Sequence, residues 1–149
     1  MQNKKEEEEV WKDIPEYEGI YQVSSYGNVR SLDRPVKHFS YKSGKISTMI
    51  RRGVVMRPGS SPNGYKIVRF SKEGKPAYFA VHRLVALLFI ANPHNKPTVN
   101  HIDGNKVNNK VTNLEWVTSS ENQLHAIKTG LVKEWKNQFN SIKKNPYAA

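Results

Sequence analysis

The chain has 149 residues, of which 37% are hydrophobic, and a formal net charge of +11. This length allows one ordinary domain or two small modules with modest, modular cores. The chain has no cysteine, which excludes disulfides, thiolate zinc sites and cysteine nucleophiles and favours the cytoplasm as the default location. No apolar run approaches the roughly 20 residues that span a bilayer, so no membrane role is expected.

The positive charge is concentrated in the middle of the chain. Residues 1–29 hold three lysines against seven acidic residues, whereas residues 30–75 hold twelve lysines and arginines against two acidic residues. Such a block attracts polyanions, and aromatic residues interleaved with it favour nucleic acid as the partner. Acidic lipid and a merely solvated surface are the alternative interpretations. The interleaved aromatic residues are Phe39, Tyr41, Tyr65 and Phe70.

The first third of the chain predicts short strands and loops. Residues 1–9 form a charge run without apolar periodicity, which indicates a tail. Alternating apolar residues and turn signals over 11–34 predict a short hairpin or meander. Repeated Gly and Pro signals over 36–64 predict a loop-rich basic arm, with one short strand at 54–56 and no long element.

The next segment predicts a hairpin followed by a helix. Two strand patterns, at 65–70 and 77–81, flank the Glu73-Gly74 turn signal. The apolar run over 84–89 ends at Asn92-Pro93, which predicts a helix at the centre of the core. Beyond residue 130, one apolar stripe at helical spacing predicts a C-terminal helix that docks on the core or on DNA. Its members are Leu131, Trp135, Phe139 and Ile142.

Residues 98–130 predict two strands followed by a capped helix. The first strand ends near His101, and the second covers 114–117, where Trp116 is expected to pack in the core. Thr118 and Glu121 form a capping-box pattern that starts a helix ending near residue 130. Since helical side chains lean toward the helix N-terminus, Asn122 is aimed back at the first strand, with His125 on the same face. These residues offer only oxygen and nitrogen ligands, which suit Mg²⁺ or Mn²⁺ and hence phosphate chemistry.

Two stretches of the sequence resemble known families. Residues 99–123 read VNHIDGNKVNNKVTNLEWVTSSENQ, and their strand, strand, helix order resembles the HNH nucleases of the phage and intron homing-endonuclease type, over about 81–130. Residues 9–34, EVWKDIPEYEGIYQVSSYGNVRSLDR, resemble the DNA-contacting modular domain that is commonly joined to such nucleases. The resemblance implies a DNA endonuclease of phage or mobile-element origin.

The resemblance also implies roles for four residues. His101 matches the first histidine of the family and would be the general base. Asn113 matches the central asparagine, which would orient the His101 ring or tie the loop between the strands. Asn100 and Asn122 match the metal ligands, although some relatives have Asp in place of Asn100. Two neutral ligands predict that the metal, Mg²⁺ first and Mn²⁺ second, binds mainly when DNA is present.

Ten basic residues are expected to contact double-stranded DNA. They are Arg30, Arg34, Arg51, Arg52, Arg57, Lys66, Arg69, His82, Arg83 and His125. A structural histidine is the alternative for His82 and for His125. The asparagines at 105, 108 and 109 are interpreted as turn residues that tolerate left-handed backbone, without a role in the site.

The sequence therefore predicts an α+β protein with a small antiparallel β module, a ββα-metal unit and a C-terminal helix. The predicted function is metal-dependent DNA cleavage, as a nick or a double-strand cut, and the alternative is a non-cutting DNA-binding or packaging-accessory module. A monomer and a dimer both stay open. The predicted boundaries are 1–9 for the tail, 10–64 for the DNA-binding module, 65–130 for the nuclease domain with its core at 98–130, and 131–149 for the C-terminal helix.

Overall fold

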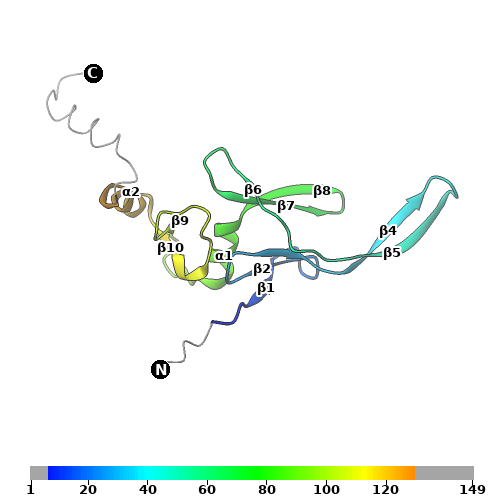
Figure 1. The fold of residues 1–149 in the computed structure, drawn as a ribbon, viewed down its shortest axis with the longest axis horizontal. Helices are drawn as coiled ribbons and strands as arrows, with labels where there is room; N and C mark the ends of the chain where they lie inside the picture. Colours follow the sequence, from blue (N-terminus) through cyan, green and yellow to red (C-terminus); the bar gives the residue numbers. More distant parts are fainter. Residues whose placement is uncertain (1–6, 130–149) are drawn as a thin grey trace, which may run out of the picture.

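A computed structural model describes residues 7–129. Small antiparallel sheets pack around α1, and α2 lies at one end of the molecule beside β9 and β10, which confirms the α+β class (Figure 1). The predicted C-terminal helix lies outside the described residues. None of the helices in the described part is both long and apolar enough to cross a membrane. The strands are β1 (Trp11–Asp13), β2 (Tyr21–Ser24), β3 (Val29–Ser31), β4 (Arg34–Ser40), β5 (Lys45–Arg51), β6 (Gly59–Ser60), β7 (Lys66–Lys72), β8 (Lys75–Ala80), β9 (Thr98–His101) and β10 (Leu114–Val117), and the helices are α1 (Val81–Phe89), the 3₁₀ turn η1 (Val111–Asn113) and α2 (Ser119–Lys128).

The predicted meander is confirmed as the sheet β1-β2-β3. Its strands pair antiparallel, and the apolar residues of β2 and β3 that alternate with polar ones are buried. The turn between β2 and β3 is held by the Ser24 hydroxyl, which accepts hydrogen bonds from the backbone N–H groups of Tyr26 and Asn28. Gly27 lies in this turn with a φ of +83°, where a side chain is strained.

The prediction that residues 36–64 contain no long element is wrong. Strands β4 and β5 form a paired hairpin of seven residues on each side that projects from the body of the molecule (Figure 1). Every residue of β5 is exposed. The strand therefore lacks the alternation of buried apolar and exposed polar residues by which a sequence predicts a strand. Backbone pairing and the Gly44 turn, with a φ of +65°, make the hairpin. The strand predicted at 54–56 is reduced to one isolated bridge between Arg30 and Val55.

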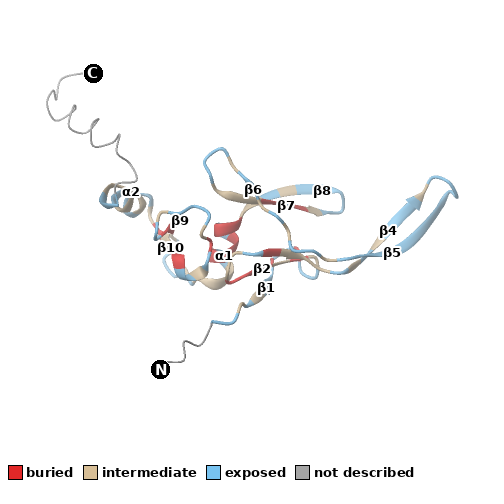
Figure 2. Ribbon diagram, in the orientation of Figure 1, coloured by how far each residue is buried: buried red, intermediate tan, exposed pale blue. Residues whose placement is uncertain are grey.

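One core joins the N-terminal and central parts of the described chain. The predicted hairpin and helix are confirmed as β7-β8 and α1, and Figure 2 shows buried residues on β2, β7 and α1. The expectation of separate modular cores is therefore wrong, because one cluster takes residues from the meander, the hairpin, α1, β9 and β10. Its fully buried members include Val23, Val29, Phe70, Val81 and Val85.

The ββα unit follows the sequence prediction closely. Strands β9 and β10 pair antiparallel, with His101 opposite Leu114 and Asn100 opposite Glu115. The capping box of α2 is present, since Thr118 and Glu121 exchange side-chain and backbone hydrogen bonds. Trp116 packs against the core as expected and donates a hydrogen bond of 3.2 Å to the carbonyl of Ile90.

Candidate active site

A pocket of about 390 Å³ lies where β9, the β9-β10 loop and α2 meet. The structure brings Asn100, His101, Asn122 and His125 together around it, as the sequence geometry predicted. Asn122 is half-buried in the first turn of α2, and His125 is one turn further along the same face. The lining is completed by Tyr65, Val99, Gly104, Lys106 and Ala126.

His101 is buried and held by a partner that the sequence analysis treated only as a turn residue. Its side chain is 5% exposed, and its Nε2 lies 2.8 Å from Oδ1 of Asn109, which is itself buried. Since a carboxamide oxygen only accepts hydrogen bonds, this contact is a hydrogen bond in the tautomer that has its proton on Nε2. Nδ1 is therefore the ring nitrogen that is left to accept a proton from a reactant.

The interpretation of the loop asparagines as left-handed turn residues is wrong. The non-glycine residues with positive φ in the described chain are Glu16, Glu73 and Asn95, and the left-handed position in the β9-β10 loop belongs to Gly104, with a φ of +73°. Asparagine was expected there because it tolerates this conformation, but glycine takes it at no steric cost. The loop asparagines instead supply side-chain hydrogen bonds.

Asn113 ties the β9-β10 loop together. Its Oδ1 accepts from the backbone N–H of Asp103 at 3.0 Å, and its Nδ2 donates to Asp103 and to the carbonyl of Asn108 at 2.9 Å each. These contacts match the second of its two predicted roles. The other predicted role of Asn113, orienting the His101 ring, is wrong because Nε2 of that ring is hydrogen-bonded to Asn109 instead. Hydrogen bonds from Asn108, Asn105 and Asn113, in that order of effect, lower the pKa of Asp103.

Asn100 is oriented by a carboxylate across the strand pair. Its Nδ2 donates a 2.8 Å hydrogen bond to Glu115, which leaves Oδ1 as the free group of the amide. An oxygen fixed in this way suits a hard divalent cation, and so does the carboxamide of Asn122 on the same pocket. Within residues 7–129, no group of three or more His, Cys, Asp or Glu side chains could hold a metal, so a metal here would rely on these amides and on other oxygen donors.

His82 is buried, which favours the structural alternative for this histidine over the predicted contact with DNA. Its ring is 7% exposed and packs against both Tyr65, at 4.8 Å between ring centroids, and His101, at 5.1 Å, which are 6.0 Å from each other. Its Nδ1 is buried without a hydrogen-bond partner among the described residues. Burial, and to a smaller extent the charges of His101 and Arg83, lower the pKa of His82 to about 4, so the ring is neutral at pH 7.

Two residues of the pocket, Lys106 and Tyr65, were not predicted as site residues. Lys106 lines the pocket, donates to the carbonyl of Asn63 at 2.8 Å and holds its ammonium 4.9 Å from the ring centroid of Tyr65. Lys106 therefore brings a positive charge to the edge of the pocket. The signal that could have found it is its place in the loop between the two strands that carry the site.

The other predicted DNA-contacting cations have different surroundings. Arg30 is half-buried, bonded to Gln22 and stacked over Trp11, and Arg52 pairs with Asp33 at 2.7 Å. The guanidinium of Arg34 lies 5.4 Å from the ring centroid of Tyr21, and the ammonium of Lys66 lies 3.2 Å from the hydroxyl of Ser60. The predicted cations that are exposed are Arg51, Arg52, Arg57, Arg69 and Arg83.

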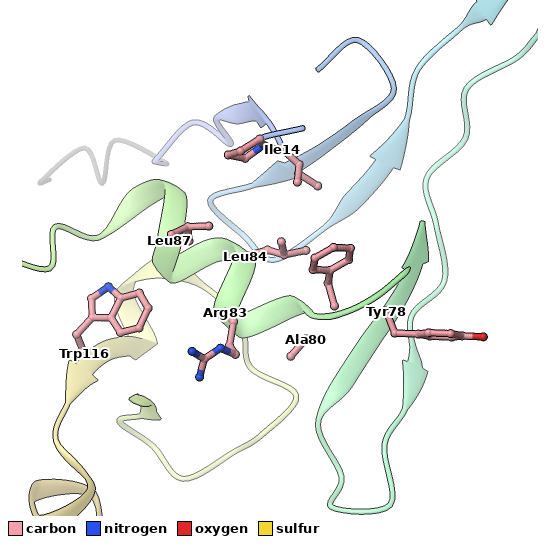
Figure 3. A pocket seen from close by; sticks show the side chains of 9 residues that line it. Ile14, Tyr78, Ala80, Arg83, Leu84, Leu87 and Trp116 are labelled. Carbon is pink, nitrogen blue, oxygen red and sulfur yellow. The ribbon is translucent and has the colours of Figure 1, made fainter. Parts of the chain in front are cut away.

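Arg83 belongs to a hollow other than the histidine pocket. Its guanidinium bonds the carbonyl of Pro97 at 3.3 Å, and it lines a pocket of about 380 Å³ with Leu84, Leu87 and Trp116 (Figure 3). This second pocket is mostly apolar and holds none of the predicted metal ligands. The chemistry-bearing residues therefore gather in one pocket only among those described.

Comparison with known proteins identifies the family. Residues 9–71 match the NUMOD4 motif, and residues 79–124 match the HNH endonuclease model. The solved structure described as DNA binding and cleavage by the HNH homing endonuclease I-HmuI superposes with a TM-score of 0.63 and 37% sequence identity, covering 91% of this chain and 68% of that chain. The chain belongs to the HNH endonuclease family.

Curated HNH proteins of phages and a giant virus are similar to the chain. The DNA endonuclease I-HmuI of Bacillus phage SP01 is 38% identical over 86% of this chain and 63% of its own length. The HNH endonuclease L247 of Acanthamoeba polyphaga mimivirus is 38% identical over 87% of this chain. The chain spans 26% and 29% of the lengths of the two mimivirus relatives. The family assignment agrees with the resemblance seen in both halves of the sequence.

Proposed function

We propose that this HNH protein is a metal-dependent endonuclease that hydrolyses phosphodiester bonds in double-stranded DNA. The observation that carries the proposal is the buried His101 ring, whose Nε2 is bonded to Asn109 while the pocket also holds Asn100 and Asn122. An imidazole held at Nε2 beside oxygen ligands is an arrangement that suits the activation of water next to a bound phosphate. We place this activity in the cytoplasm of the host of a phage or mobile element.

Five residues of the pocket have a defined task in this proposal. His101 accepts the proton of the attacking water at Nδ1, and its place at the end of β9 keeps the ring at the pocket that Asn100 also lines. Asn100 and Asn122 would hold Mg²⁺, with Mn²⁺ as the second candidate, and the ion would neutralise charge on the leaving oxygen. Lys106 and His125 at the pocket edge supply hydrogen-bond donors for the neighbouring phosphates.

The β4-β5 hairpin supports DNA as the substrate. Arg34 lies directly opposite Arg51 in the strand pairing, where like charges repel. A polyanion relieves this repulsion, and a projecting two-stranded ribbon has the dimensions of a DNA groove. The superposed homing endonuclease I-HmuI binds and cleaves DNA, which supports the same partner for this chain. We retain 10–64 as the DNA-binding module, 65–130 as the nuclease domain and 131–149 as a basic C-terminal segment.

A nicking assay separates this function from its rival. Supercoiled plasmid is incubated with the full chain, with Mg²⁺ or with EDTA, and the nicked and linear products are measured. Cleavage that depends on Mg²⁺ supports the nuclease. Tight DNA binding without cleavage under both conditions would favour the non-cutting DNA-binding or packaging-accessory module. The ratio of nicked to linear product reports whether one or both strands are cut.

A further inference from the structure

The turn of the N-terminal meander packs against the loop that carries Asn109. The backbone N–H of Val111 donates a 2.9 Å hydrogen bond to the carbonyl of Ser25. A Cβ added to Gly27 would lie 2.7 Å from Cβ of Asn109 and 2.8 Å from its carbonyl oxygen. The ammonium of Lys110 lies 5.2 Å from the ring centroid of Tyr26. Segments about 80 residues apart in sequence therefore share one tight contact.

The meander turn is a firm support for this contact. Ser24 and Ser25 are buried, and the Ser24 hydroxyl bonds two backbone N–H groups within the turn. Ser25 is paired with Val10 through its backbone N–H and its hydroxyl, at 2.8 and 3.0 Å. Since the polar groups on both sides of the turn are bonded, displacing it breaks several hydrogen bonds at once.

Asn109 links this support to the histidine. Its backbone touches Gly27, and its side-chain Oδ1 bonds Nε2 of His101 at 2.8 Å. Both Asn109 and His101 are buried, so a shift of the Asn109 backbone moves the acceptor away from the ring or turns the ring with it. The position of His101 therefore depends on the N-terminal turn as well as on its own strand.

We propose that the Ser24–Asn28 turn, acting through the positioning residue Asn109, fixes the orientation and the tautomer of the His101 ring. The inference rests on the proposed function for its effect on the reaction. The N-terminal module is then part of the support of the active site, in addition to binding DNA. Gly27 is required because any larger residue would enter the space of the Asn109 backbone.

The chain offers a matched pair of variants for the test. Gly27 and Gly19 both have positive φ, +83° and +72°, and both belong to the meander region, but no atom lies within 4 Å of a Cβ added to Gly19. Gly27→Ala and Gly19→Ala therefore impose similar backbone strain, and only Gly27→Ala presses on Asn109. The full chain carrying each change is measured for single-turnover plasmid nicking with Mg²⁺, for affinity to a metal-free DNA duplex, and for the ring ¹⁵N signals of His101 by NMR.

We expect Gly27→Ala to lower the nicking rate about 10- to 100-fold, as losses of supporting residues at metal sites do. The affinity for the duplex should stay within about twofold, and the His101 signals should move away from those of a ring protonated at Nε2. Gly19→Ala should match the wild type in all three measurements. Equal rates and equal ring signals in the two variants would overturn the inference.

Two changes of Asn109 keep the test decisive if Gly27→Ala fails to fold. Asn109→Ala removes the acceptor and should lose the Nε2–H signature, whereas Asn109→Asp keeps an oxygen at the same place and should retain it. An unchanged signature in Asn109→Ala would refute the role of Asn109. The ring signals need no catalysis, so they decide this inference even if the wild-type chain cuts no DNA and the proposed function fails.

Discussion

Glu115 and Asn100 face each other across the β9-β10 pair, and the carboxylate of Glu115 accepts a 2.8 Å hydrogen bond from Nδ2 of Asn100. This hydrogen bond engages Nδ2 and leaves Oδ1 as the free end of the Asn100 amide. It also places a carboxylate one hydrogen bond away from Asn100, the proposed metal ligand. In the proposed metal site, Glu115 would add negative charge next to the neutral amide of Asn100.

Replacing Glu115 should raise the Mg²⁺ concentration that nicking requires, without weakening DNA binding. In Glu115→Ala, the Asn100 amide is free to rotate, so the Mg²⁺ concentration for half-maximal nicking should rise about tenfold or more. A Mg²⁺ titration of the nicking rate measures this change. Glu18→Gln, which alters an exposed carboxylate of the meander region, is the control and should leave the titration unchanged. Identical Mg²⁺ titrations for Glu115→Ala and the wild type would show that Glu115 does not support the metal site.

Asn113 should contribute mainly to stability. Asn113→Ala leaves partners in Asp103 and Asn108 without their hydrogen bonds, which should lower the free energy of unfolding by about 1–3 kcal/mol. Urea denaturation followed by fluorescence measures the loss. Asn105→Ala, in the exposed part of the same loop, should cost less than about 0.5 kcal/mol. Equal losses in the two variants would contradict the role of Asn113 in the loop.

His82 should make the folded state sensitive to acid. Its pKa is about 4 in the folded protein and 6.5 without the fold, so the unfolded chain binds more protons between these values. The free energy of unfolding should therefore fall as the pH is lowered from about 6.5 to 4, by on the order of 3 kcal/mol. Denaturation across this range should show a flatter dependence in His82→Gln than in a variant of the exposed His94. Equal slopes in both variants would contradict burial of a neutral His82.

Arg51 should contribute to DNA affinity through a phosphate contact. Arg51→Gln removes an exposed charge of the hairpin. The slope of the logarithm of the DNA-binding constant against the logarithm of the salt concentration should therefore become less steep by about 0.9. Lys12→Gln removes the same charge from a residue bonded to the carbonyl of Leu88 and should keep the slope. Binding measured over a series of NaCl concentrations gives both values. A slope unchanged in Arg51→Gln would move the DNA interface away from the hairpin.

The sequence predicted the elements whose residues alternate between buried and exposed positions, and it missed those without this pattern. The meander, α1 and the ββα unit were predicted because burial and capping act on local spacing. The β4-β5 hairpin was missed because all of β5 is exposed. The shared core could not be predicted, because residues far apart in sequence meet only in the folded chain.

The sequence predicted the part of the site that belongs to the strand, strand, helix motif. Asn100, His101, Asn122 and His125 meet at one pocket because strand ends and helix faces have regular geometry. The bond between Asn109 and His101 depends on the path of an irregular loop, which no periodicity encodes. Burial of His82 follows from tertiary packing against Tyr65 and His101, so the sequence alone left its structural and DNA-contacting interpretations both open.

His101 is the residue on which the proposed mechanism depends most, because it removes the proton from the attacking water. Single-turnover nicking of supercoiled plasmid with Mg²⁺ compares the wild type with His101→Ala and with His94→Ala, which changes an exposed histidine outside the pocket. We expect His101→Ala to cut about 10²- to 10⁴-fold more slowly, with its DNA affinity retained, while His94→Ala cuts as the wild type does. Equal cutting by His101→Ala and the wild type would contradict the mechanism.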